Sequence, residues 1–209
     1  MEIEDVFAHN ERWVAQQLQC DPDYFRRLSA HQQPEWLFFA CSDSRISVES
    51  LLGTKPGDVF MHRNIGNVVP SNDLNALSVI SYAVNHLRIK HIIVCGHYQC
   101  GGVLAAMSPR DEGLLNPWLR HIRDVYRIHR DQLNAIDSLE ERYDRLVEFN
   151  VREQCINIVK TRDAQHALLH DRLQIHGWVF DMRSGRLIDL QLNMDEIMSD
   201  IMDVYDLFR

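Results

Sequence analysis

Short apolar runs that alternate with amphipathic helical segments restrict the fold of this chain more than any other feature of its sequence. The runs from Trp36 to Ala40 and from His91 to Cys95 are short and largely apolar, as in strands buried on both faces of a parallel sheet. A further short strand is predicted at Asp58 to Met61, and helical patterns cover Ile46 to Leu52 and Asp73 to Leu87. Strands that alternate with helices predict a mostly parallel sheet.

The C-terminal part of the sequence predicts a hairpin at the edge of this sheet. The runs from Ile175 to Phe180 and from Leu187 to Leu192 flank the turn signal Ser184-Gly185. The expected fold is therefore α/β, with about four parallel strands, one antiparallel edge strand and flanking helices. Ser138 predicts the start of a long helix that we expect in an outer layer, and Asp195 predicts the cap of a last one.

The length of 209 residues fits one domain, so we expect a single domain over residues 1–209. A helical arm covers about residues 1–30, with an interruption at Asp21-Pro22-Asp23. The polar segment from His62 to Asn67 is expected to be a loop. Because the arm carries Trp13 and Leu18 among its apolar positions, we expect it to cover another surface.

Composition and charge exclude several classes of function. Apolar residues make up 45% and charged residues 25% of the chain, which is ordinary for a soluble globular protein. A formal net charge of −8 argues against a nucleic-acid surface, which needs clustered basic residues. The acidic start and the absence of a run of about 20 apolar residues predict a cytoplasmic protein with no membrane partner.

The five cysteines indicate metal binding or catalysis rather than a disulfide framework. Their number is odd and they are widely spaced in a chain that is large enough to fold without cross-links. Cys20, Cys95 and Cys155 are interpreted as small buried apolar residues, the usual role of a free cysteine. Cys41 and Cys100 occur in a different context, because each follows a predicted strand closely.

Cys41, His97 and Cys100 are the candidate metal ligands. In a parallel sheet the loops that follow the strands meet at one edge, so the two segments that carry these residues should lie close together. Thiolate sulfur and imidazole nitrogen are the ligands that Zn²⁺ prefers, and three protein ligands leave the fourth tetrahedral position for water or substrate. The sequence therefore predicts one zinc ion in an open site.

Asp43 and Arg45 are the candidate catalytic residues beside this site. Two thiolates and a neutral imidazole leave the zinc shell near neutral, so bound water is acidified less than in an all-histidine site. Asp43 can accept a hydrogen bond from the proton of zinc-bound hydroxide and orient its attack, and Arg45 can keep Asp43 ionised and turned away from the metal. Asp43 released from Arg45 could instead bind zinc and close the site.

The pattern Cys41-x-Asp43-x-Arg45 with His97-x-x-Cys100 resembles the β class of carbonic anhydrases, of the bacterial type. The segments Arg63-Asn64 with Gly66-Asn67 and Ile175-His176-Gly177-Trp178 match as well. The resemblance implies reversible hydration of carbon dioxide to bicarbonate, one Zn²⁺ per chain, and a homodimer or homotetramer with the active site near the subunit boundary.

Some bacterial members of this class form a subgroup that binds a second, regulatory bicarbonate. They use a Trp three residues before the first Cys, the Arg of the Arg-Asn motif and a Tyr after Gly-Trp. This chain has Phe38, Arg63 and Phe180 at those positions. Because two of the three expected donors are missing, we expect no bicarbonate regulation by that route.

Three other functions remain open at this point. A structural zinc site would need a fourth fixed ligand, and none is evident in the sequence. A cysteine hydrolase with Cys41 or Cys100 paired to His97 would work without metal. A hydrolase of carbon disulfide or carbonyl sulfide on the same fold would use the same zinc chemistry.

Overall fold

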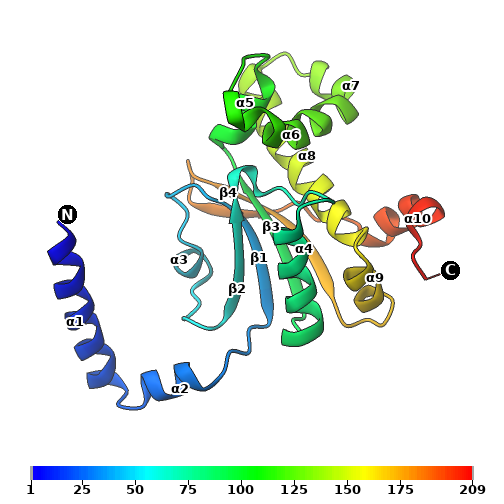
Figure 1. Ribbon diagram of the computed structural model, residues 1–209. Coiled ribbons are helices and arrows are strands. Elements are labelled where there is room, and N and C mark those ends of the chain that lie inside the picture. The colour runs from blue at the N-terminus through cyan, green and yellow to red at the C-terminus, as the bar shows by residue number, and fades with distance from the viewer. Residues whose placement is uncertain (1, 209) are drawn as a thin grey trace.

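The apolar runs form the centre of a five-stranded sheet in a computed structural model, which describes residues 2–208 (Figure 1). The strand order is β2-β1-β3-β4-β5, in which the first four strands are parallel and β5 pairs antiparallel with β4. This arrangement confirms the predicted α/β fold. The strands are β1 (Trp36–Cys41), β2 (Val59–Asn64), β3 (His91–His97), β4 (Gln174–Asp181) and β5 (Arg186–Asp189).

Helices flank the sheet, and three of them lie beyond the carboxyl ends of its strands. Figure 1 shows α5, α6 and α7 beyond the carboxyl end of β3, whereas α1 and α2 lie apart from the sheet. The helices are α1 (Ile3–Cys20), α2 (Tyr24–Ala30), α3 (Val48–Leu52), α4 (Leu74–Ser81), α5 (Gly101–Met107), α6 (Asn116–Ile128), α7 (Arg130–Asn134), α8 (Leu139–Val159), α9 (Arg162–Leu168) and α10 (Met194–Tyr205), with short turns η1 (Ile65–Asn67) and η3 (Gly113–Leu115) and a π-helical segment η2 (Tyr82–Leu87).

The long helix α8 packs directly on β3 and β4, so it belongs to a helical layer that covers the sheet, as predicted. Glycines in the strands permit this close approach. A Cβ atom on Gly96 would lie 2.6 Å from Val151 Cγ2, and one on Gly177 would lie 3.1 Å from Val151 Cγ1. The lack of a side chain at Gly96 and at Gly177 therefore allows α8 to lie this close to the strands. Helical periodicity in the sequence does not reveal this relation.

The predicted polar loop from His62 to Asn67 is also corrected. The residues from His62 to Asn64 belong to β2 and pair with the segment from Phe39 to Cys41. A parallel ladder is made by backbone groups, and an edge strand tolerates polar side chains, so polarity alone did not mark the end of the strand. Only the last part of the segment leaves the sheet, as the turn η1.

Helix caps follow the sequence in one case and depart from it in another. Ser138 accepts a hydrogen bond from the backbone N–H of Glu141, as predicted for the start of α8. At α10 the cap is Asn193, which accepts from Glu196, so the prediction of Asp195 is wrong. Asp195 lies in the first turn, where a carboxylate stabilises the helix through its dipole.

The N-terminal arm has no buried residue in α1 or α2, although its helices carry large apolar side chains. Ile3 and Phe7 are 70% and 68% exposed. Cys20 is exposed as well, which corrects its interpretation as a buried residue, whereas Cys95 and Cys155 are buried as predicted. Among the described residues, no helix combines the length and the apolar character that crossing a bilayer requires.

Gly66, in the turn after β2, is a position where we predict that a methyl group destabilises the fold. Its φ of 75° is left-handed, and a Cβ atom would lie 2.7 Å from Cδ1 of the buried Ile122. Gly66→Ala should lower the free energy of unfolding by about 1–2 kcal/mol for the backbone conformation and about 1–2 kcal/mol more for the overlap. Urea denaturation measures the change.

Gly185→Ala is the matched control, because Gly185 has a φ of 71° and no atom within 4 Å of the added Cβ. This variant should show only the backbone cost. Equal losses for the two variants would contradict the argument from packing.

Candidate metal centre

The three predicted ligands come together at the carboxyl edge of the sheet. Cys41 is the last residue of β1, His97 is the last residue of β3, and Cys100 directly precedes α5. Parallel pairing of β1 with β3, with Ala40 opposite Cys95, brings the two strand ends to one place. Their ligand atoms all lie within 4.8 Å of one another, and the residues are 6%, 0% and 1% exposed, respectively.

The geometry of this cluster fits a tetrahedral metal ion. His97 donates from Nδ1 to the carbonyl of Tyr98 at 2.9 Å, which leaves a lone pair on Nε2. That Nε2 atom is buried and has no hydrogen-bond partner among the described residues. The Sγ atoms of Cys41 and Cys100 are 3.8 Å apart. Two sulfurs about 2.3 Å from one tetrahedral ion would be separated by about 3.8 Å.

The electrostatics of the cluster favour a thiolate at Cys41. Its pKa lies well below the usual range of a thiol, chiefly because the Cys100 thiol donates a hydrogen bond to it. Because Cys100 donates its proton in this hydrogen bond, the pKa of Cys100 is raised, and burial raises it further. A divalent cation between the two sulfurs would replace that proton, since metal ligation requires the deprotonated thiol.

Asp43 lies beside the cluster and is held by Arg45. Arg45 donates from Nε to Oδ1 of Asp43 at 2.9 Å and from Nη2 to Oδ2 at 2.7 Å, and its backbone N–H donates to Oδ1 at 3.0 Å. These bonds hold the pKa of Asp43 far below its ordinary value. Oδ2 is 3.8 Å from Nε2 of His97. Asp43 is therefore an ionised acceptor that rests on Arg45 and faces the cluster.

Comparisons with known proteins agree with this geometry. A family model described as carbonic anhydrase matches residues 36–187. A carbonic anhydrase of Emericella nidulans is 50% identical over 98% of this chain and 90% of its own length. The β-carbonic anhydrase CafA of Aspergillus fumigatus superposes with a TM-score of 0.90 at 37% identity, over 97% of both chains. A tetrameric β-carbonic anhydrase of Sordaria macrospora superposes with a TM-score of 0.86 at 36% identity, over 90% of this chain and 96% of its own.

The chain belongs to the β class of the carbonic anhydrase family. The predicted resemblance to the β class is thereby confirmed. β-Carbonic anhydrases are zinc enzymes, and a site of two cysteines and one histidine suits that metal. A structural zinc site would need a fourth ligand, and the described Cys, His and acidic residues bring only three to the cluster.

Arg63 holds the backbone that carries Cys41 and Asp43 in this carbonic anhydrase. Its guanidinium donates to the carbonyls of Cys41 at 2.9 Å, of Asp43 at 2.7 Å and of Ile46 at 3.1 Å. The sequence marked Arg63 only through its place in the Arg-Asn motif. Since Nε, Nη1 and Nη2 are all engaged with the chain itself, the structure offers a reason for Arg63 that does not involve a second bicarbonate.

Tyr143 is a residue near the site that sequence reasoning missed. Its hydroxyl donates to the carbonyl of Cys100 at 2.6 Å, and burial raises the pKa of that hydroxyl. Tyr143 lies on α8, 43 residues beyond Cys100, and no local pattern connects the two positions. Only the packing of α8 on the sheet brings them together.

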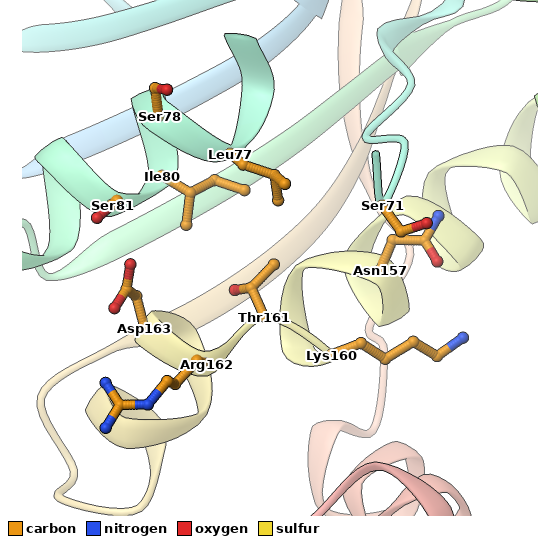
Figure 2. A pocket seen from close by; sticks show the side chains of 10 residues that line it. All are labelled: Ser71, Leu77, Ser78, Ile80, Ser81, Asn157, Lys160, Thr161, Arg162 and Asp163. Atoms are coloured by element: carbon orange, nitrogen blue, oxygen red, sulfur yellow. The ribbon is translucent and has the colours of Figure 1, made fainter. Parts of the chain in front are cut away.

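A cavity of 450 Å³ lies elsewhere in the molecule, between α4, α8 and α9, and shares no residue with the metal cluster (Figure 2). Figure 2 shows the charged ends of Lys160 and Arg162 extending in opposite directions, away from Leu77 and Ile80. Lys160 instead lies over the ring of Tyr205, and Arg162 lies over the ring of Phe208. These two cations are therefore not directed into the cavity, whereas the carboxylate of Asp163 extends toward α4.

Arg63→Met should weaken both the fold and the metal centre. Three carbonyls would lose a charged donor, so we expect the free energy of unfolding to fall by about 2–4 kcal/mol. The same variant should retain less zinc, because the Cys41 loop loses its anchor. Urea denaturation and metal analysis measure these changes. Arg186→Met, at an exposed position of β5, is the control. Unchanged stability and zinc content in Arg63→Met would contradict this role.

Proposed function

We propose that this chain catalyses the reversible hydration of carbon dioxide to bicarbonate and a proton, with Cys41, His97 and Cys100 holding one Zn²⁺. The observation that carries the proposal is the position of Asp43, whose Oδ2 lies 3.8 Å from the unpartnered Nε2 of His97. This carboxylate is placed to bind a water molecule beside the metal ligands. Membership in the carbonic anhydrase family supports the same reaction.

Zinc held by two thiolates and one imidazole would supply a Lewis acid that lowers the pKa of water, although less than an all-histidine site does. The protein residues decide the direction of attack. An ionised carboxylate can only accept hydrogen bonds, so the attacking water must turn a hydrogen toward Oδ2 of Asp43 and a lone pair toward carbon dioxide. Addition of water to carbon dioxide forms one C–O bond and opens one C–O π bond, whose electron pair moves to oxygen. One O–H bond of the water breaks, and its proton leaves to solvent.

Arg45 is proposed to preserve this acceptor. Its paired hydrogen bonds lower the pKa of Asp43 and fix both oxygens, so the carboxylate stays ionised even at acid pH and does not leave Arg45 to enter the ligand cluster. Arg45 also donates to the carbonyl of Gln99 at 3.3 Å, which connects Asp43 to the Cys100 loop. The dyad thereby joins the two halves of the site.

Asp43→Asn should retain zinc and lose most of the activity. The amide can donate a hydrogen bond, so it no longer forces one orientation on the water, and a loss of about 10²-fold or more in the hydration rate is expected. Stopped-flow hydration of carbon dioxide and zinc analysis of the same sample test this expectation. Carbonyl sulfide and carbon disulfide, assayed beside carbon dioxide, test the substrate.

Asp124→Asn is the matched control, since Asp124 also pairs with an arginine, Arg127, but on the exposed face of α6. It should leave the rate unchanged. Loss of zinc from Asp43→Asn would make Asp43 a ligand or a structural support instead. An undiminished rate with zinc bound would remove the Asp43–Arg45 pair from the mechanism.

We also infer that the enzyme associates with copies of itself through the N-terminal arm. Helix α1 has no buried residue within the chain, and an isolated helix with exposed Ile3 and Phe7 gains little stability without a packing surface. The related enzyme of Sordaria macrospora is tetrameric. A second copy of the chain is therefore the proposed partner of the arm.

Phe7→Asp should lower the molar mass observed in solution, because a charge would replace an apolar contact between subunits. Light scattering coupled to gel filtration measures this mass against 24.5 kDa for one chain. Gln16→Asp, an exposed position on the opposite side of the same helix, is the control and should keep the mass of the wild type. A wild type of 24.5 kDa would contradict self-association.

A further inference from the structure

A backbone N–H group donates to one of the sulfurs in the metal cluster. The N–H of Gly66 lies 3.4 Å from Sγ of Cys41, and both groups are buried. Hydrogen bonds to ligand atoms adjust a metal site, because they set the orientation and electron density of the ligand. The position of this N–H therefore matters for the metal, and it depends on what holds the peptide between Ile65 and Gly66.

The indole of Trp118 holds the opposite end of that peptide. Its Nε1–H donates to the carbonyl of Ile65 at 2.8 Å. The carbonyl of Ile65 and the N–H of Gly66 belong to one planar unit and point in opposite directions, so fixing one fixes the other. The bond also polarises the peptide, which strengthens the donor on its far side.

The next peptide, between Gly66 and Asn67, is also held by a hydrogen bond. Asn150, fully buried on α8, donates from Nδ2 to the carbonyl of Gly66 at 2.8 Å. Cδ1 of Ile122 occupies the space that a Cβ atom on Gly66 would need, and Ile122 lies one turn after Trp118 on α6, so one face of that helix covers the turn. The carbonyl groups before and after the Cα of Gly66 thus each accept a hydrogen bond, and an apolar side chain covers the residue. These contacts fix the direction in which the N–H of Gly66 points.

We propose that Trp118 is a positioning residue for the metal centre, acting through the Ile65–Gly66 peptide to direct a hydrogen bond onto the sulfur of Cys41. The inference rests on the proposed function, since it requires a metal ion held by Cys41, His97 and Cys100. Among the described residues, the indole N–H of Trp118 donates to the carbonyl of Ile65 and not to a candidate ligand, so its action on the metal centre is indirect. Its effect is to keep electron density on one sulfur low and the ligand in place.

Removal of the indole N–H should therefore change the metal–sulfur bond itself. Cobalt(II) in place of zinc provides the readout, because sulfur-to-cobalt charge transfer absorbs at a wavelength set by the electron density on sulfur. In Trp118→Phe this band should move to longer wavelength than in the wild type. The transfer of zinc to a chelator should become about tenfold faster, the lower end of the effect of losing an outer partner of a metal ligand.

Trp36→Phe is the matched control. Trp36 begins the strand that ends at Cys41, so the same substitution is made about 17 Å from the metal ligands. Replacement of Trp118 by the isostere benzothienylalanine provides a second variant, which removes the N–H but keeps the ring system and its packing. It should reproduce the shift of the band even if Trp118→Phe folds poorly.

The outcomes separate the two proposals. A wild-type protein that takes up no cobalt, or shows no sulfur charge transfer, would overturn the metal site and this inference with it. A wild type with the band, together with an isostere variant whose band and zinc transfer match the wild type, would overturn the inference alone. A shift in both Trp118 variants and none in Trp36→Phe would establish it.

Discussion

Parallel pairing of β1 with β3 is the interaction on which the rest of the structure depends. The register that places Ala40 opposite Cys95 brings Cys41 and His97, 56 positions apart in sequence, to the same edge of the sheet. Every other feature of the site builds on that edge: the turn that delivers Cys100, the loop that carries Asp43, and the turn at Gly66 that follows the neighbouring strand. A slip of one residue between the strands would turn alternate side chains to the opposite face and separate the ligands.

Polar side chains then fix the loops that the sheet brings together. Arg63 on β2 binds three carbonyls of the loop after β1, Tyr143 on α8 binds the carbonyl of Cys100, and Asn150 on α8 binds that of Gly66. Each of these bonds goes to backbone rather than to a side chain. The backbone of the site is therefore held in position by side chains that do not take part in the reaction. These side chains come from β2 and α8 rather than from the loops themselves.

The electrostatic design separates two tasks. The buried sulfurs and the imidazole form a cluster that attracts a cation, whereas Asp43 is kept ionised by an arginine that is half exposed to solvent. If Asp43 were not paired, it would be free to enter the cluster as a further anionic ligand. The pairing with Arg45 keeps the carboxylate at the rim, where a water molecule can reach it, and this is the arrangement that the proposed reaction requires.

The sequence by itself determined the class of fold, the order of its strands and helices, and the residues that gather at the metal cluster. Short apolar runs that alternate with helical segments are typical of strands in a sheet with both faces covered, and cysteine and histidine after such runs are chemically suited to a metal. Only the tertiary structure decided the extent of β2, the packing of α8 against Gly96, and the roles of Tyr143, Asn150 and Trp118. These features depend on contacts between segments distant in the chain, and neither periodicity nor motif spacing carries information about such contacts.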